Sequence, residues 1–293
     1  MKKYILAHWC YSANFGDALN PYLLEKLTGC KVRYCNTFKP NYKQELIRML
    51  KTLLHLHRYN YRLLFQPETK RPVILGIGSI LSRSRPNHLV WGAGYMDATE
   101  RGLGGKYLAV RGPFSADKLV AEGYPHCSVY GDPALLLPLV YTPSITQKHK
   151  VGIVPHLRDY FSIKSTFTNT HVIYLAKKTE AIINEICSCE YILSTSLHGI
   201  IVAHAYGIPA LWVKKGYIFT DGIKFNDYFA SVDIPIYDGA QFKLEDFKNK
   251  SYKDISPAIK SLMLPQKPLI EIQKDLLKVA PFKVKQDILD KVM

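Results

Sequence analysis

Short apolar runs alternate along this chain with segments whose apolar residues recur at helical spacing. Lys3–Trp9, Pro72–Gly76 and Leu89–Trp91 are such runs, and they predict buried strands. A turn rich in glycine or polar residues follows each of these runs. Segments with helical spacing lie between some of the predicted strands. This alternation is typical of an α/β fold with open parallel sheets, in which the loops after the strands bind ligands.

The first run and the segment after it form a predicted strand–helix unit. Asn20-Pro21 has the residue types of an N-cap and a first helical position, and Gly29 is suited to end that helix. The polar loop in between, residues 10–17, ends in Asp17. From this position the carboxylate either caps the following helix or acts on a bound substrate.

A polar connection over Tyr141–Lys150 divides the chain into two predicted domains. It contains Pro143 and several hydroxyl residues, and the α/β pattern restarts after it. We therefore expect an N-terminal α/β domain over residues 1–142 and a C-terminal α/β domain over residues 148–293. The second domain ends in a helical segment, Pro268–Val292, which could pack back across the first domain.

The most informative stretch, residues 191–213, reads as strand, polar turn, helix, turn and strand. Its first apolar run ends in three hydroxyl residues, and the helix is predicted to begin near His198-Gly199. Unpaired backbone N–H groups and the positive end of the helix dipole would then face one spot, which favours anion binding. In the simpler alternative, Ser196 is only an N-cap and His198 a packed turn residue. The candidate site residues here are Ser194, Thr195, Ser196, His198 and Gly199.

Two further candidates close predicted strands at the ends where open α/β sheets bind ligands. Arg111 ends the strand Tyr107–Arg111, where its guanidinium could bind an anion through two parallel hydrogen bonds. A structural salt bridge is the alternative role for this arginine. His156 follows the first strand of the second domain, Val151–Pro155, and could contact either of two substrates.

The composition is that of a folded globular protein. Of the 293 residues, 47% are hydrophobic and 12% aromatic, which supports a substantial core and argues against general disorder. The apolar stretch Met1–Trp9 is interrupted by His8 and is too short for a signal peptide or a membrane span. Six cysteines lack paired CxxC spacing, so we expect reduced thiols and a cytoplasmic protein. We expect no metal site, because no set of His and carboxylates has convincing ligand spacing.

Positive charge is concentrated early in the chain. The net charge is +15, and residues 1–90 hold fifteen basic and four acidic side chains, a net charge of +11. Within Lys43–Phe65, apolar residues recur at helical spacing between cations that include Lys51, Arg58 and Arg62. Such a segment could lie on an anionic bilayer and hold the protein at the inner face of the membrane. The alternative is a core-facing helix with a solvated basic face, and no motif for nucleic acid binding is present.

Eight short motifs follow one another between Asn14 and Tyr228. In sequence order they are Asn14-Phe15-Gly16-Asp17, Gly76-Ile77-Gly78-Ser79, Trp91-Gly92-Ala93-Gly94, Val110-Arg111-Gly112-Pro113, Gly131-Asp132-Pro133-Ala134, Ile153-Val154-Pro155-His156, Ser196-Leu197-His198-Gly199 and Lys224-Phe225-Asn226-Asp227-Tyr228. In this order they resemble the polysaccharide pyruvyl transferase family. The resemblance implies two Rossmann-like domains with a cleft between them, the arrangement called GT-B.

The same resemblance implies that pyruvate moves from phosphoenolpyruvate to a sugar as a cyclic ketal, with release of phosphate. The sugar would belong to a cell-surface polysaccharide, such as a capsule or exopolysaccharide, or to its lipid-linked precursor. No cofactor is implied beyond the donor substrate. Arg111 and His198, from the two halves, are the expected partners of the donor's two anionic groups, with the acceptor on the N-terminal side. His198 and Asp17 are the expected acid and base, in either order, and Asn14 is a further expected substrate contact.

One departure from the family pattern concerns the residue before the Leu-His pair. Several relatives have arginine there, whereas this chain has Ser196, so the cation that binds the donor's phosphate or carboxylate is left open. An alternative function is a nucleotide-sugar-dependent glycosyltransferase of the same GT-B shape, in which the helix at His198 binds a nucleotide diphosphate. A non-enzymatic alternative is a basic module that binds a membrane surface or another polyanion.

Overall fold

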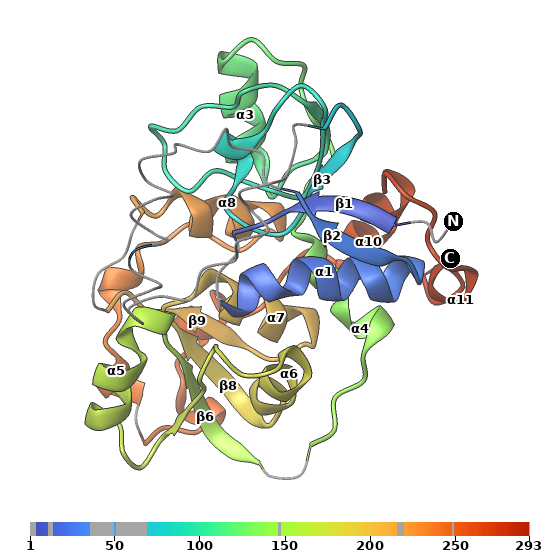
Figure 1. Cartoon of the computed structure of the whole chain (residues 1–293). Coiled ribbons are helices and arrows are strands. Elements are labelled where there is room, and N and C mark those ends of the chain that lie inside the picture. The colour runs from blue at the N-terminus through green and yellow to red at the C-terminus, as the bar shows by residue number, and fades with distance from the viewer. Residues whose placement is uncertain are drawn as a thin grey trace.

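Two parallel β-sheets with helices packed around them form the protein (Figure 1). The computed structural model describes residues 4–10, 14–35, 50, 69–145, 148–215, 220–247 and 249–292. The predicted basic segment Lys43–Phe65 lies outside these residues, except for Leu50. The predicted α/β class with parallel sheets is confirmed, and the two sheets are consistent with Rossmann-like folds.

The first sheet contains five strands in the order β2-β1-β3-β4-β5, and every neighbouring pair is parallel. β3 and β4 are mostly buried, and their apolar sequences suit the interior of a sheet. β2 is an edge strand with exposed and half-buried residues, and the apolar pattern does not predict it. The strands are β1 (Tyr4–His8), β2 (Lys31–Tyr34), β3 (Val73–Leu75), β4 (His88–Trp91) and β5 (Lys106–Ala109).

Helix α1 (Phe15–Thr28) begins earlier than the sequence predicts. Its N-cap is Asn14, and Pro21 lies inside the helix rather than at its start, so the predicted Asn20-Pro21 boundary is wrong. Proline has no N–H to donate to the carbonyl of Asp17. The Asn20 side chain instead donates a long hydrogen bond of 3.5 Å to that carbonyl. The end of the helix at Gly29 is as predicted, because Gly29 adopts a left-handed conformation with φ of 70°.

The second sheet has four parallel strands in the order β7-β6-β8-β9. Its central unit matches the predicted strand–turn–helix–turn–strand pattern over residues 191–213. The strands are β6 (His149–Val154), β7 (His171–Val172), β8 (Cys189–Ser194) and β9 (Ala210–Trp212). The helices are α3 (Pro113–Ala121), α4 (Leu137–Val140), α5 (Tyr160–Thr166), α6 (Thr179–Cys187), α7 (Leu197–Ala205), α8 (Ile223–Ser231), α9 (Pro257–Lys260), α10 (Leu269–Lys278) and α11 (Gln286–Leu289).

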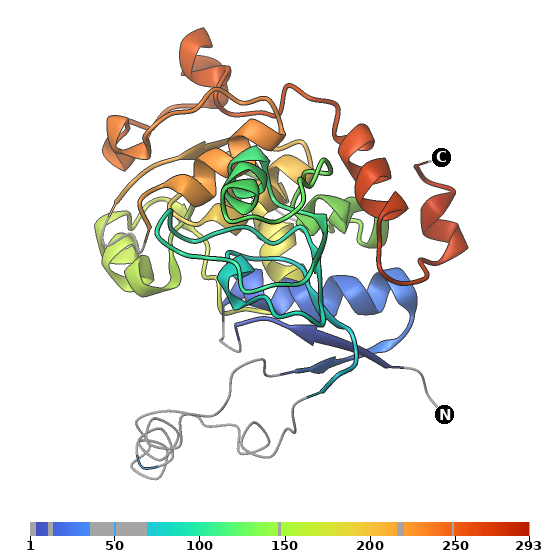
Figure 2. The same cartoon turned by 90° about the horizontal axis from the view of Figure 1, so that it is seen from above.

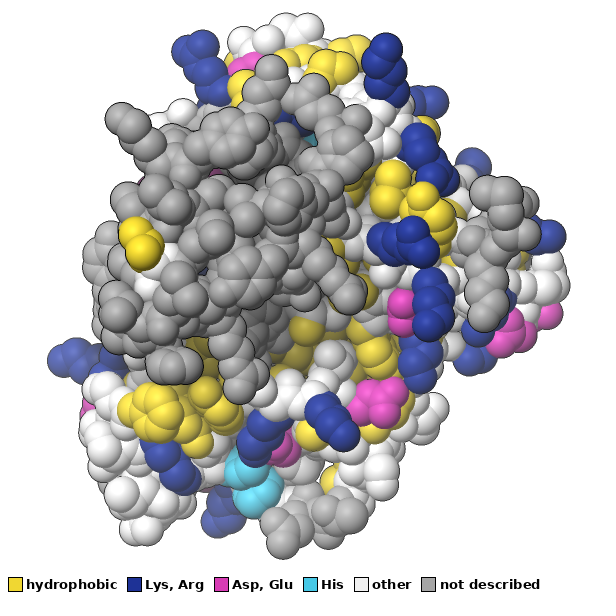
Figure 3. Space-filling view, viewed as in Figure 1, with side chains coloured by type: hydrophobic (Ala, Val, Ile, Leu, Met, Phe, Trp, Pro, Cys, Tyr) yellow, Lys and Arg dark blue, Asp and Glu magenta, His cyan; other side chains and the backbone are white. Residues whose placement is uncertain are grey.

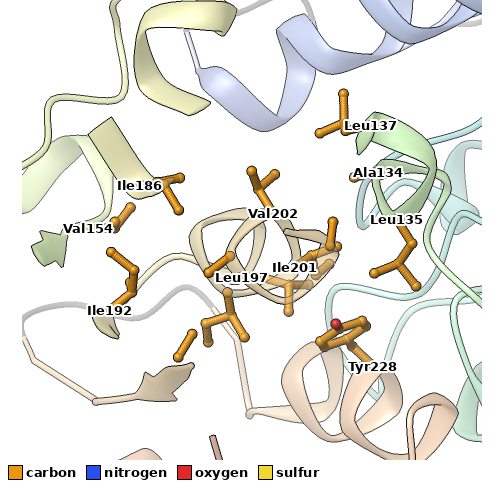
Figure 4. Packing of buried hydrophobic residues seen from close by; sticks show 14 of the residues in the cluster. Ala134, Leu135, Leu137, Val154, Ile186, Ile192, Leu197, Ile201, Val202 and Tyr228 are labelled. Atoms are coloured by element: carbon orange, nitrogen blue, oxygen red, sulfur yellow. The ribbon is translucent and has the colours of Figure 1, made fainter. Parts of the chain in front are cut away.

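One hydrophobic cluster extends through both halves of the chain. Figure 4 shows Val202 and Ile201 of α7 on the side of the helix that faces Leu135 and Leu137. Leu135 belongs to the short 3-10 helix η3 (Pro133–Leu136), which continues into α4. α7 is apolar around nearly its whole circumference, as expected for a helix that is buried on all sides. This burial fixes the direction of its N-terminus.

The C-terminal segment returns to the first half of the molecule, as the sequence allowed. The indole Nε1 of Trp91 in β4 donates to the carbonyl of Leu276 in α10 at 2.9 Å. The backbone N–H of Lys285 donates to the carbonyl of Leu27 at the end of α1, also at 2.9 Å. Figures 1 and 2 both show α10 and α11 beside the C-terminal end of α1. These contacts tie the C-terminal segment to β4 and to the end of α1.

Lys and Arg side chains are spread along the part of the surface shown in Figure 3. The net charge of the chain is positive, +15, and the electric field of a positively charged protein attracts anionic partners. No helix among the described residues has both the length and the apolar content needed to cross a membrane.

Candidate functional site

His198 lies in the first turn of α7, directly after the carboxyl end of β8. Ser196 is the N-cap, and the backbone N–H groups of the first helical turn have no partners within the helix. These groups and the helix dipole make the turn favourable for an anion. The predicted helix start near His198 is therefore confirmed, and His198 is part of this N-terminus.

The three hydroxyl residues before α7 have different surroundings. Ser194 Oγ accepts a hydrogen bond from the Ser196 N–H at 3.0 Å and lies within hydrogen-bond distance of the carbonyl oxygens of Val154 and Ser196. Thr195 Oγ1 accepts a hydrogen bond from the His156 N–H at 2.7 Å. Within the described part of the chain, no hydrogen bond involves the Ser196 hydroxyl. Ser194 and Thr195 thus hold the turn, and substrate contact by all three stays a prediction.

Gly199 is required by packing. A Cβ atom at this position would lie 2.5 Å from Ser194 Oγ and 2.6 Å from Val154 Cγ1. The glycine lets α7 approach β6 and β8 closely, and this approach sets the position of the helix start. Close packing alone therefore accounts for glycine at this position, and a role in substrate binding stays a prediction.

The His198 ring is held between two elements of the first half of the chain. On one side it packs against Gly16 in the first turn of α1, where a Cβ atom would collide with the imidazole. On the other side His198 Nε2 lies 3.7 Å from Asp132 Oδ2. The Asp132 side chain is fully buried, and that of His198 is 13% exposed. The N-termini of α1 and α7 therefore meet at one imidazole.

Asp132 is a site residue whose role the sequence does not reveal. Its Oδ1 accepts a hydrogen bond from the Ala134 N–H at 2.9 Å, as expected for the N-cap of η3. Its Oδ2 has no hydrogen-bond partner within the described residues and faces His198. The buried carboxylate lies beside the imidazole and limits the orientations that the ring can adopt.

Asn14 and Asp17 flank the Gly16 contact with His198. Asn14 is the N-cap of α1, and Asp17 lies in its first turn, half-buried. Asp17 is therefore not the cap of this helix. The structure brings the first turn of α1, with the predicted acid–base candidate Asp17, next to the first turn of α7.

Arg111 forms a buried ion pair with Asp227. Its side chain is fully buried, and Nε and Nη2 both lie 3.1 Å from Asp227 Oδ2. Nη2 also donates to the carbonyl of Tyr95 at 2.7 Å, and Nη1 donates to Ser79 Oγ at 2.8 Å. Asp227 further accepts hydrogen bonds from the N–H and hydroxyl of Ser115. This geometry matches the structural salt bridge that the sequence left open, while donor contact by Arg111 stays a prediction.

The Arg111–Asp227 pair fixes α8 against the first half of the molecule. Gly112 allows the close approach, because a Cβ atom there would overlap the backbone carbonyl of Asp227. Lys224 lies in the first turn of the same helix. Burial, and to a smaller degree the charge of Arg111, lower the pKa of the Lys224 ammonium to about 8. A half-buried cation beside another cation is a favourable partner for an anionic ligand.

His156 lies near Lys224, at the end of β6. Burial lowers the pKa of His156, and the positive charge of Lys224 lowers it further. His156 is also joined to the α7 turn through the hydrogen bond from its N–H to Thr195 Oγ1. The sequence shows Lys224 as part of a motif, and its partial burial and neighbours are long-range features that no local pattern reveals.

The polar groups described above are suited to an anionic substrate that undergoes proton transfer. Lys224 and the first turn of α7 supply positive charge, and His198 can exchange a proton. Within the described residues, no group of three or more His, Cys, Asp or Glu side chains is arranged to hold a metal ion.

Two comparisons with known proteins place the chain among its relatives. Residues 46–214 match the polysaccharide pyruvyl transferase family. An uncharacterized protein of Acanthamoeba polyphaga mimivirus, L143, is 29% identical over 247 residues, which cover 78% of this chain and 74% of the viral protein. The family match spans more than half of the chain and includes Arg111, Asp132 and His198. The chain belongs to the polysaccharide pyruvyl transferase family.

Proposed function

We propose that the protein transfers pyruvate from phosphoenolpyruvate to a sugar of a cell-surface polysaccharide or its lipid-linked precursor. The observation that carries the proposal is the position of His198, where the N-termini of α1 and α7 meet and Asp132 supports the ring. Such a group can bind near a phosphate and protonate a neighbouring carbon or oxygen. The reaction needs no metal or cofactor.

Phosphoenolpyruvate carries a phosphate and a carboxylate, and each of these anionic groups needs a binding group on the protein. One anionic group binds at the first turn of α7, where N–H groups and the Ser196 hydroxyl are available. The other pairs with Lys224, whose ammonium takes the role that arginine before the Leu-His pair has in several relatives. The donor then lies in a cleft between a C-terminal donor domain and an N-terminal acceptor domain, with His156 near its edge.

The chemical steps require one acid and one base. His198 protonates the methylene carbon of the enol, and a sugar hydroxyl attacks the adjacent carbon after losing its proton to Asp17. The C–O bond to phosphate then breaks, and phosphate leaves with the bonding electrons and takes up the proton held by Asp17. A second sugar hydroxyl attacks the same carbon, gives its proton to the His198 imidazole and closes the ketal. Asp132 lies behind the imidazole and holds the ring in place for proton transfer.

Binding of phosphoenolpyruvate should stabilise the protein against heat and should weaken at alkaline pH. Lys224 has a pKa of about 8 in the free protein, and a bound anion would raise it, so binding takes up a proton above that pH. Affinity should fall by up to about tenfold per pH unit above pH 8. Thermal-shift titrations between pH 6.5 and about 9.5 would measure this dependence.

Lys224→Met should weaken binding at neutral pH and remove most of this alkaline decline. Lys253→Met, an exposed lysine far along the chain, is the matched control and should behave as the unmodified protein. A thermal shift with UDP-sugars but none with phosphoenolpyruvate would instead support the glycosyltransferase alternative. Equal pH profiles for the protein and for Lys224→Met would remove Lys224 from the donor site.

Gly16→Ala should slow phosphate release from phosphoenolpyruvate because the added methyl group displaces the His198 ring. A displacement near 1 Å at a reacting group costs on the order of a hundredfold in rate. Alanine favours the helix, so any loss of stability would come from the collision itself. Steady-state phosphate release measures the effect, and Ala18→Ser, on the exposed side of the same turn, is the control. Unchanged turnover in Gly16→Ala would show that the position of His198 is unimportant.

Association with a membrane surface stays part of the proposal through the lipid-linked acceptor. The basic segment Lys43–Phe65 that motivates it lies outside the described residues, except for Leu50. Its cations would attract anionic lipids, and that attraction would weaken as salt rises.

A further inference from the structure

Three aromatic rings form a cluster at the carboxyl end of the second sheet. Tyr160 and Phe161 open α5, and Tyr174 follows β7. The ring centroids of Tyr160 and Tyr174 are 4.4 Å apart, and those of Phe161 lie 5.2 and 6.3 Å from the other two. In Figure 3, hydrophobic side chains gather at the lower left, in the region that α5 occupies in Figure 1.

Phe161 is 74% exposed, more than any other large hydrophobic side chain among the described residues. Burial of a phenylalanine is favourable, so an exposed ring supported by two others calls for an explanation. Tyr160 is packed against the core, which holds the cluster in a fixed position. The cluster is therefore an aromatic surface that is anchored through Tyr160 and exposes the ring of Phe161 to solvent.

A short turn joins this cluster to the proposed donor site. The 3-10 helix η4 (Leu157–Asp159) runs from His156 directly to Tyr160. Asp159 interacts electrostatically with His156 and is half-buried, with its Oδ2 atom shielded from solvent. A carboxylate accepts hydrogen bonds from hydroxyl groups, and Oδ1 is the Asp159 oxygen that a ligand on the surface would use. The aromatic surface and this carboxylate are adjacent along the chain.

We propose that Tyr160, Phe161, Tyr174 and Asp159 form a subsite for a pyranose ring of the acceptor. The C–H face of a pyranose is apolar and can stack on an aromatic ring, while its hydroxyl groups donate hydrogen bonds to a carboxylate. The subsite deepens the proposed function and rests on it. A contact with an anionic bilayer is less favoured, because the Asp159 carboxylate would repel anionic headgroups.

Saturation-transfer NMR with methyl glucosides, galactosides and mannosides tests the subsite on the full-length protein. We expect protons of one pyranose face to receive most saturation, and Phe161→Ala to weaken binding by about tenfold. Asp159→Asn should weaken binding less, since the amide oxygen still accepts a hydrogen bond. Val120→Ala removes an exposed hydrophobic side chain from α3 and should change nothing. In phosphate-release assays, Phe161→Ala should raise the KM of the sugar and leave that of phosphoenolpyruvate unchanged.

Two results would overturn the subsite. One is the absence of binding of all these glycosides to the unmodified protein, and the other is equal binding by Phe161→Ala. Reduced sedimentation of Phe161→Ala with phosphatidylglycerol vesicles, together with unchanged sugar binding, would assign the rings to a membrane instead. If glycosides bind through Phe161 while phosphoenolpyruvate does not bind, the sugar subsite stands and the proposed donor is wrong.

Discussion

Replacing His198 with Gln should reduce phosphate release from phosphoenolpyruvate by about a hundredfold or more. Glutamine keeps hydrogen-bonding capacity and a similar length, but it cannot exchange a proton or become a cation near neutral pH. The melting temperature should change little, because glutamine has a similar length and the only ion-pair partner of His198 in the described structure, Asp132, lies 3.7 Å away. Steady-state phosphate release and thermal unfolding measure the two effects.

Two further variants belong to this test: Asp132→Asn changes the neighbour of His198, and His126→Gln is the control. Asp132→Asn keeps an oxygen for the Ala134 N–H and removes the charge behind the imidazole, so it should slow phosphate release without a large loss of stability. His126 is exposed, and its substitution should have no effect. A His198→Gln variant that loses stability but keeps its turnover per folded molecule would make His198 a structural turn residue.

Breaking the Arg111–Asp227 pair on one side should destabilise the fold strongly. Arg111→Met leaves the Asp227 carboxylate buried without its counter-ion, which costs about 3–5 kcal/mol. Adding Asp227→Asn should recover part of this loss, because the asparagine oxygen still accepts from the Ser115 N–H and carries no charge. Denaturant unfolding of the single and double variants measures the coupling between the two residues.

The surface pair Lys26–Glu180 offers a matched control. Its atoms lie 3.3 Å apart with about half of each side chain exposed, so Lys26→Met should cost no more than about 1 kcal/mol. Equal losses in Arg111→Met and Lys26→Met would contradict the structural role of the buried pair. If the stable double variant lacks phosphoenolpyruvate binding while Lys224 is intact, Arg111 contacts the donor as the sequence predicted.

The fold was predictable where local pattern and tertiary position agree. The segment Tyr191–Val213 contains two buried strands, a polar turn and a helix that ends at a glycine. Residues close together in the sequence indicate each of these elements. The sequence does not predict β2, because an edge strand with polar residues has neither an apolar run nor a buried face. The start of α1 was misplaced because Pro21, which usually marks a first turn, lies inside the helix.

The site was predictable only in part, for a physical reason. Helix N-termini and hydroxyl turns have local signals, so His198 and the residues before it could be identified as an anion site. The partners of these residues come from distant parts of the chain. Asp132 reads locally as a turn former, and Asp227 as a member of a motif, until the fold places them against His198 and Arg111.

The central claim is that the three-carbon unit of phosphoenolpyruvate becomes a ketal on a sugar. The direct measurement incubates the protein with phosphoenolpyruvate labelled with 13C at C2 and with methyl hexopyranosides, and follows the label by NMR and mass spectrometry. We expect a labelled glycoside, heavier by one pyruvate unit minus water, to form in equal amount with phosphate, and to be lost in His198→Gln. Label found only in phosphoenolpyruvate or free pyruvate, with none on the sugar, would contradict pyruvyl transfer.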